Sequence, residues 1–252
     1  MSRKPLRTVH FAAALTAALI AAIVIGACTP QAGTPAFRTD PTAAPTTAAA
    51  AVPANFTPVS IGQGPCVGVR DVAQNITKGP GSYTRPQQVI TPGKTYCAII
   101  TMEKGRIVIQ LYPEVAPQHV NSFVFLAQQG YFDGLTFHRV IPDFVAQGGD
   151  PTGTGTGGPG YTLPLEVNPA VKYDRPGVLG MARTNDPNSA GSQFFITYGA
   201  LPNLDPGPAG EGYTIFGQVV EGYDVVRAIT PRDPQRASTP GDKMLRVRIV
   251  EK

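Results

Sequence analysis

The sequence predicts a mainly β protein whose strands form a closed antiparallel barrel capped by two α-helices. Gly and Pro supply 28 and 26 of the 252 residues, a density that interrupts long helices and favours turns between short strands. Seven or eight short apolar runs alternate with turn residues, and only two stretches have helical spacing. The hydrophobic fraction of 42% is enough for one core, and the lack of a Gly-X-Y period excludes a collagen-like chain.

The regular pattern begins with a hairpin and a helix. Residues 96–102 and 106–112 are apolar β-runs, and the Gly-containing turn at 103–105 joins them. Residues 117–129 are predicted to be helical, with Gly130 ending the helix. The apolar residues of this stretch recur at helical spacing, namely Val120, Phe123, Val124 and Ala127.

Short strands and one further helix follow toward the C-terminus. The apolar runs that predict strands are 136–141, 144–147, 178–182, 193–197 and 214–220. A short helix is expected at 224–230, and residues 245–250 alternate with period two as a closing strand. Residues 153–158 are rich in glycine, but Pro159 follows directly, which favours a flexible surface loop over a phosphate-binding loop.

The first 28 residues have the layout of an export signal. A basic start precedes the apolar run 11–27, which is short for a membrane span. The small residues directly before Cys28 resemble the lipobox of bacterial lipoproteins, in which cleavage precedes a cysteine that becomes lipidated. This pattern predicts a signal peptide at 1–27 and a lipid anchor on Cys28. The alternative is an uncleaved N-terminal anchor with an ordinary cysteine.

Removal of the signal peptide changes the charge balance. The remaining chain has 18 Lys and Arg against 17 Asp and Glu, a net charge of +1, so a nucleic-acid partner is not expected. Residues 28–58 are dominated by Ala, Thr and Pro and are predicted to be a disordered, extended tether. We therefore expect an exported protein, attached through lipidated Cys28 to the periplasmic or cell-surface side of a bacterial membrane.

The two other cysteines, Cys66 and Cys97, are expected to form a disulfide, because an exported chain is found where disulfides persist. This bond would join an irregular extension, residues 59–94, to the domain that follows. Two buried thiols are the alternative. A metal site is not expected, since the chain after Cys28 contains only two histidines, His119 and His138, at none of the usual ligand spacings.

Two blocks carry the strongest functional signal. They are FHRVIPDFVAQGGD at 137–150 and MARTNDPNSAGSQFFI at 181–196, and both resemble cyclophilins, the peptidyl-prolyl cis-trans isomerases. The resemblance continues through 204–205 and 213–217 and covers 95–252. It implies an isomerase domain with an eight-stranded barrel and two helices. It also implies that proline-containing peptides are the substrates and that no cofactor or metal is needed, and we expect a monomer.

The resemblance also assigns roles to individual residues. Arg139 would contact the prolyl nitrogen, and its permanently charged guanidinium suits stabilisation of a twisted amide. Gln147 and Gln193 would hold backbone groups of the substrate, and Ala182 and Arg183 would pair with its main chain. The pocket for the proline ring would be formed by Phe144, Val145, Phe195 and Leu204, with Tyr213 beside them. Alternate residues of a β-strand point to the same side, which by itself puts Gln193 and Phe195 on one face of their strand. The position of Phe144 in the pocket rests on the resemblance alone.

The sequence departs from the family pattern at three of these positions and at Asn203, which precedes Leu204. Val145 replaces a frequent Met, Arg183 replaces the Asn of animal members, Asn203 stands where those members have Trp, and Tyr213 stands where His is common. His138 is expected to be structural, because the reaction needs no general base.

Two functions are compatible with this pattern. The first is an active isomerase that assists the folding of exported proteins. The second is a non-catalytic module, or chaperone, that binds proline-containing segments in the same groove.

Overall fold

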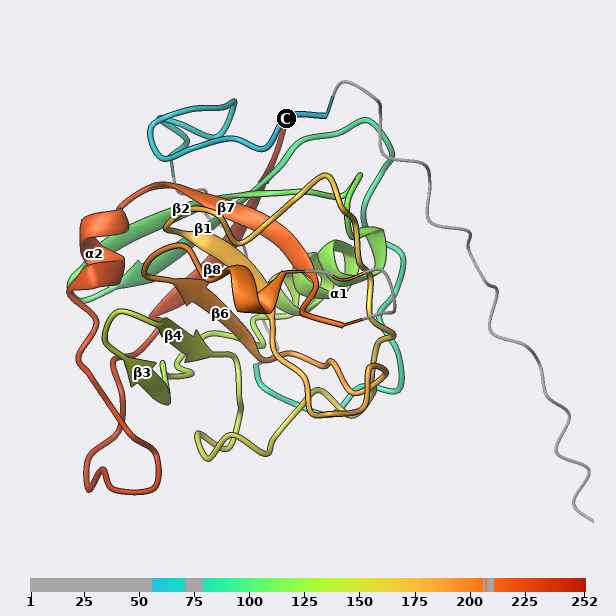
Figure 1. Ribbon diagram of the computed structural model, residues 1–252. Helices are drawn as coiled ribbons and strands as arrows, with labels where there is room; N and C mark the ends of the chain where they lie inside the picture. The colour runs from blue at the N-terminus through green and yellow to red at the C-terminus, as the bar shows by residue number, and fades with distance from the viewer. Residues whose placement is uncertain (1–55, 71–78, 206, 208–210) are drawn as a thin grey trace, which may run out of the picture. The chain divides into compact units, whose positions relative to one another are not determined.

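The computed structural model describes residues 56–70, 79–205, 207 and 211–252 (Figure 1). The predicted signal peptide, Cys28 and almost all of the predicted tether lie outside the described residues. Within the described part of the chain, no helix is long and apolar enough to cross a membrane.

Eight strands form one antiparallel sheet in the order β3-β4-β6-β5-β7-β2-β1-β8 (Figure 1). Their bounds are β1 Tyr96–Met102, β2 Gly105–Leu111, β3 Arg139–Ile141, β4 Val145–Gly148, β5 Val178–Met181, β6 Phe194–Thr197, β7 Ile215–Glu221 and β8 Arg246–Glu251. The helices are α1 Pro117–Gln128 and α2 Tyr223–Arg227, and a short 3-10 turn covers Pro202–Leu204. The prediction of a mainly β fold with two helices is confirmed.

The predicted closure of the barrel is not confirmed. β3 and β8 end the strand order and are not paired with each other in the described residues, so the sheet is a half-barrel. Two isolated bridges lie in the gap, Thr136 with Lys243 and Val140 with Arg232. The irregular segment 231–243 therefore takes the place of direct strand pairing, which a reading based on apolar periodicity could not detect.

The helix α1 is buried along most of its length, and packs beside β8. Phe123 lies at the centre of the core, stacked on Phe132 with ring centroids 4.8 Å apart and in edge contact with Phe194 at 5.5 Å. The start of α1 is capped from a distance. The Glu166 carboxylate accepts hydrogen bonds from the amides of Gln118 at 3.1 Å and His119 at 3.0 Å, which satisfies two otherwise unpaired donors.

The helix α2 is shorter than the 224–230 that the sequence predicts. It begins after Gly222, whose φ of 75° is a left-handed conformation. A Cβ at this position would collide with the carbonyl oxygen of Arg106, so the close approach of α2 to β2 requires glycine there.

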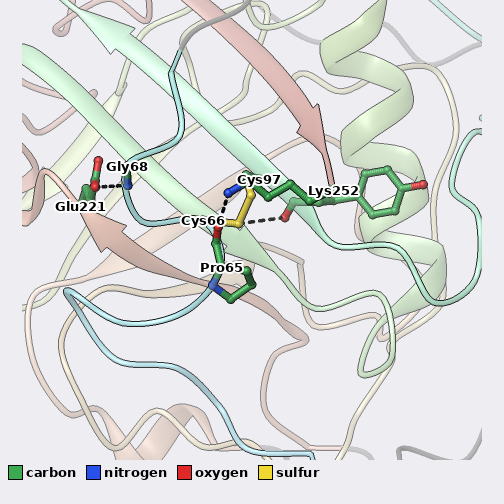
Figure 2. Close-up of a disulfide and its surroundings, with 7 residues drawn as sticks. Pro65, Cys66, Gly68, Cys97, Glu221 and Lys252 are labelled. Carbon is green, nitrogen blue, oxygen red and sulfur yellow. Dashed lines mark hydrogen bonds between the residues drawn. A yellow bond between two sulfur atoms is a disulfide. The ribbon is translucent and has the colours of Figure 1, made fainter.

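The described parts of the 59–94 extension contain no helix or strand. The disulfide expected between Cys66 and Cys97 is present and joins this extension to β1, with the two Cα atoms 5.6 Å apart (Figure 2). Two further contacts surround the bond. Gly68 donates its amide to the Glu221 carboxylate, and the Lys252 ammonium donates to the carbonyl of Pro65 at 2.6 Å (Figure 2).

Candidate active site

A cavity of about 230 Å³ opens at the β3–β4–β6 end of the sheet. It is lined by Arg139, Phe144, Val145, Gln147, Ala182, Arg183, Phe195, Leu204 and Tyr213. All nine were predicted as site residues from the sequence, and the fold brings them together. The tenth, Gln193, lines an adjoining groove that also includes Gln147, Ala182 and Arg183.

Strand register aligns the central residues of the cavity. Arg139 on β3 is opposite Gln147 on β4, Gln147 is opposite Phe195 on β6, and Phe195 is opposite Gly180 on β5. These four positions form one row across neighbouring strands, so their side chains lie next to one another. Gly180 leaves the space that the Phe195 ring occupies, because a Cβ on Gly180 would collide with that ring and with the Tyr173 hydroxyl.

Phe144 reaches the cavity through a turn that the sequence analysis did not foresee. The Phe144 amide donates to the Ile141 carbonyl at 3.1 Å, and Asp143 between them has a φ of 60°. Asp tolerates this left-handed conformation better than most residues. The turn joins β3 to β4 and sets the direction of Phe144, which strand parity could not assign.

A chain of side-chain hydrogen bonds orients the polar residues. Arg139 Nη1 donates to Gln147 Oε1 at 3.2 Å, and Gln147 Nε2 donates to Gln193 Oε1 at 3.0 Å. Gln193 Nε2 then donates to the carbonyls of Gly155 at 3.0 Å and Gly157 at 2.8 Å. Within the described part of the chain Arg139 has no other side-chain hydrogen bond, so four of its five N–H donors remain available to a ligand.

The glycine-rich segment that receives Gln193 is held by one carboxylate. Asp150 accepts hydrogen bonds from the amides of Thr152 at 2.7 Å and Thr154 at 3.1 Å, and also from the amide of Gly155. Burial raises the pKa of Asp150, but hydrogen bonds from Thr152, Gly155 and Gly157 more than offset the effect, and the pKa is lowered overall. The predicted surface loop therefore also anchors Gln193, which lines the groove beside the cavity, and no feature of the loop's own sequence indicates this contact.

The aromatic wall of the cavity is built on Phe195. Its ring stacks on Tyr173, with centroids 5.8 Å apart, and meets the edge of Tyr213 at 5.7 Å. The guanidinium of Arg183 lies over the Tyr213 ring, with its carbon 5.0 Å from the ring centroid. Arg183 Nε also donates to the Gly212 carbonyl at 2.9 Å. Tyr173 could not be identified from the sequence, because only the folded sheet brings residue 173 behind residue 195.

Replacing Gly180 with alanine should damage the cavity without touching its polar groups. The added methyl group must displace Phe195 or Tyr173, which costs about 1–3 kcal/mol of unfolding free energy and moves the ring wall. We expect kcat/KM for an Xaa–Pro peptide to fall roughly three- to tenfold. Gly199→Ala is the matched control, since no atom lies within 4 Å of its added Cβ. Equal activity in the two variants would contradict this account of Gly180.

His138 lies beside the site and is 1% exposed, and neither of its ring nitrogens has a hydrogen-bond partner among the described residues. Burial lowers the pKa of His138, and Arg232 and Arg139 act in the same direction against the opposing effect of Asp150. The folded protein therefore favours the neutral ring, which agrees with a structural role.

This burial predicts a pH-dependent stability. Below about pH 6.5 the unfolded chain protonates this histidine before the folded protein does, so the unfolding free energy falls as the pH falls toward the lowered pKa. We expect denaturant midpoints measured between pH 7 and 5 to decline less in His138→Leu than in the wild type. Parallel declines in the two proteins would refute the assignment to His138.

Among the described residues, no group of three or more His, Cys, Asp or Glu side chains is arranged to hold a metal ion.

Comparison with known proteins gives consistent matches. Residues 96–251 match the family described as cyclophilin type peptidyl-prolyl cis-trans isomerase/CLD. A peptidyl-prolyl cis-trans isomerase of Synechococcus elongatus is 46% identical over 61% of this chain and 95% of its own length. Peptidyl-prolyl cis-trans isomerase B of Bacillus subtilis is 44% identical over 52% of this chain and 89% of its own.

Solved structures agree with these matches. A crystal structure of a Cryptosporidium parvum cyclophilin type peptidyl-prolyl cis-trans isomerase has a TM-score of 0.55 and 34% identity, covering 62% of this chain and 98% of that one. A second structure of that enzyme, in the presence of the dipeptide Ala-Pro, has a TM-score of 0.54 and 35% identity, covering 60% and 96%.

Proposed function

This chain belongs to the cyclophilin-type peptidyl-prolyl cis-trans isomerases, and we propose that it accelerates rotation about Xaa–Pro bonds in exported proteins as they fold. The observation that carries the proposal is that Arg139 lines the same cavity as an apolar cup made of Phe144, Val145, Phe195 and Leu204. The structure of the Cryptosporidium parvum relative in the presence of Ala-Pro supports a proline-containing ligand.

The chemistry follows from the amide bond. Partial double-bond character sets a barrier of about 18–20 kcal/mol, and uncatalysed exchange of Xaa–Pro bonds takes tens of seconds or longer. When the bond twists, conjugation is lost, and the lone pair of the prolyl nitrogen becomes localised and able to accept a hydrogen bond. A fixed cation that donates to this nitrogen stabilises the twisted form more than either planar form.

The residues of the site divide this work between them. Arg139 donates to the prolyl nitrogen. Gln147 holds the guanidinium in this orientation by accepting a hydrogen bond from Arg139 Nη1 at 3.2 Å. The apolar cup holds the proline ring, and its volume of about 230 Å³ is below the roughly 300–1,000 Å³ of cavities for drug-sized ligands. Gln193 and the backbone of Ala182 hold the flanking peptide, so the ring stays fixed while the preceding carbonyl rotates.

The cellular setting is a further part of the proposal. The basic and apolar start of the sequence, followed by Cys28, supports an exported lipoprotein held at a bacterial membrane by two or more acyl chains. Mass spectrometry of the membrane fraction should find an acylated Cys28 at the N-terminus of the mature chain. An N-terminal peptide that still carries residues 1–27 would refute the anchor and leave the isomerase untouched.

The test of the activity is the rate of cis-to-trans conversion of an Xaa–Pro peptide, followed by two-dimensional exchange NMR with the wild-type protein. We expect catalysis at substoichiometric enzyme. Binding of the peptide without any increase in exchange rate would instead identify the non-catalytic module that uses the same groove.

A further inference from the structure

The segment 56–69, here called the strap, lies outside the residues that match the isomerase family and yet packs against the cavity's supports. At one end Phe56 meets Tyr112 edge-on at 5.2 Å, and the Val59 amide donates to the Tyr112 hydroxyl at 3.1 Å. At the other end the Cys66–Cys97 disulfide joins the strap to β1. Between them the Gly62 amide donates to the Val220 carbonyl at 2.7 Å.

Val59 connects two apolar clusters of the fold. The first surrounds the disulfide and includes Val69 as well as both cysteines. The second contains Tyr112, Tyr173 and Phe195, and therefore extends to the wall of the cavity. Val59 packs against both clusters, so the strap is in apolar continuity with the cavity wall.

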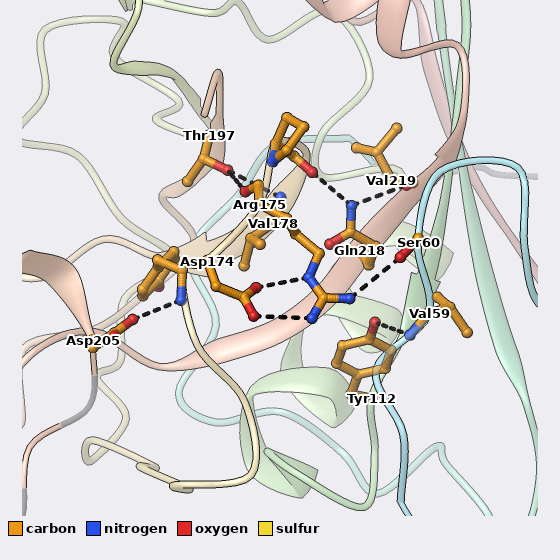
Figure 3. A network of polar contacts seen from close by, with 12 residues as sticks. Val59, Ser60, Tyr112, Asp174, Arg175, Val178, Thr197, Asp205, Gln218 and Val219 are labelled. Carbon is orange, nitrogen blue, oxygen red and sulfur yellow. Dashed lines mark hydrogen bonds and ion pairs between the residues drawn. The ribbon is translucent and has the colours of Figure 1, made fainter. Parts of the chain in front are cut away.

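A polar contact runs in parallel with this packing (Figure 3). Arg175 Nη1 donates to Ser60 Oγ at 3.3 Å, and its Nε and Nη2 bind the Asp174 carboxylate at 2.7 and 3.0 Å. The Arg175 carbonyl accepts a hydrogen bond from Thr197 at the end of β6, at 3.2 Å. Figure 3 shows these groups converging on one turn from separate segments of the chain.

The same turn carries Tyr173, which backs Phe195. The Tyr173 amide donates to Asp205 at 2.6 Å, and its carbonyl accepts from the Leu201 amide at 2.7 Å. The turn 173–175 is therefore hydrogen-bonded to three other parts of the chain, namely the strap, β6 and the segment 201–205.

We propose that the strap is a working part of the isomerase, in which Val59 and Ser60 position the 173–175 turn and so hold Tyr173 against Phe195. This inference rests on the proposed isomerase function. Val59, Ser60 and Arg175 are positioning residues, since none of them lines the cavity. They act on the ring wall only through Tyr112 and Tyr173.

Loosening the strap affects the reaction in a specific way. Gln193, the backbone of Ala182 and the rest of the apolar cup still hold the peptide in its planar ground state, so the affinity for substrate changes little. The ring wall, however, must stay fixed while the amide twists, and a small displacement of Phe195 lowers the rate of the bound substrate. A strap defect therefore lowers kcat and leaves KM almost unchanged.

The experiment compares Val59→Ala with Val69→Ala in the full chain. Both variants lose the same two methyl groups from the strap, but Val69 packs only against the cluster around the disulfide. Both should lower Tm. Activity is measured at 10 °C, and near-UV circular dichroism checks that each variant is folded. In Val59→Ala we expect kcat to fall about three- to tenfold while KM stays within twofold of the wild-type value. In Val69→Ala we expect kcat to stay at the wild-type value. Val59→Ile keeps a branched apolar side chain at this position and should have a kcat close to that of the wild type.

A second readout does not depend on catalysis. The aromatic ¹³C resonances of Phe195 should shift in Val59→Ala and stay in place in Val69→Ala. Unshifted Phe195 resonances in Val59→Ala, an unchanged kcat, or equal losses in both variants would each overturn the positioning role. An inactive wild type whose Phe195 still responds to Val59 would overturn the proposed function and leave the positioning intact.

Discussion

Arg139→Ala should lower kcat/KM for an Xaa–Pro peptide by about 100- to 1,000-fold, the effect of removing one preorganised donor from a developing charge. The loss should appear mainly in kcat, because the apolar cup and Gln193 still bind the peptide in the planar ground state. Exchange NMR at saturating peptide measures it directly. The unfolding free energy should change little, since Arg139 makes only one side-chain hydrogen bond in the described part of the chain.

Two further variants separate charge from geometry. Arg139→Lys keeps a positive charge but loses the planar fork that bonds Gln147 while facing the ligand, so its activity should lie between those of alanine and arginine. Arg236→Ala removes an arginine whose side chain is 88% exposed and should leave activity unchanged. If Arg139→Ala keeps nearly wild-type activity, Arg139 is not the donor that stabilises the twisted amide.

The double variant Cys66→Ala/Cys97→Ala should lose about 3–4 kcal/mol of unfolding free energy, the loop-entropy contribution for cysteines 31 residues apart. For a chain of this size, that corresponds to a fall in Tm of roughly 6–16 °C. The domain should still fold, because the contacts of Gly62, Gly68 and Lys252 hold the extension independently. Thermal unfolding followed by circular dichroism measures the shift.

A reductant provides the control for this experiment. Dithiothreitol should lower the Tm of the wild type by a similar amount and leave that of the double variant unchanged. A wild type whose Tm resists dithiothreitol, even though labelling shows free thiols at Cys66 and Cys97, would contradict the stabilising role.

The elements with clear periodicity were predictable from the sequence. The strand β1 has the predicted bounds, β2 is displaced by one residue, and α1 ends one residue before the predicted end. These elements were predictable because alternation and helical spacing are local properties. Arg139, Gln147 and Phe195 were found because long motif blocks contain them, and strand register then explains why they meet.

The features that were missed depend on contacts between distant segments. The cap that Glu166 provides for α1 joins residues 47 and 48 positions apart, and nothing near Pro117 indicates it. Tyr173 became part of the site only because the sheet places Gly180 beside Phe195. The barrel was predicted as closed because apolar runs reveal strands but do not show which edges pair.

The open sides of the half-barrel have a consequence for aggregation. An unpaired strand edge is a template for β-addition and aggregation. Here Val140 on β3 exchanges two backbone hydrogen bonds with Arg232, at 2.8 and 2.9 Å. At the other edge the amide of Val247 on β8 is bonded by the Asp133 side chain at 2.9 Å. Both edges are thus occupied by the protein's own chain at these points, which leaves these backbone groups unavailable for pairing with a strand of another chain.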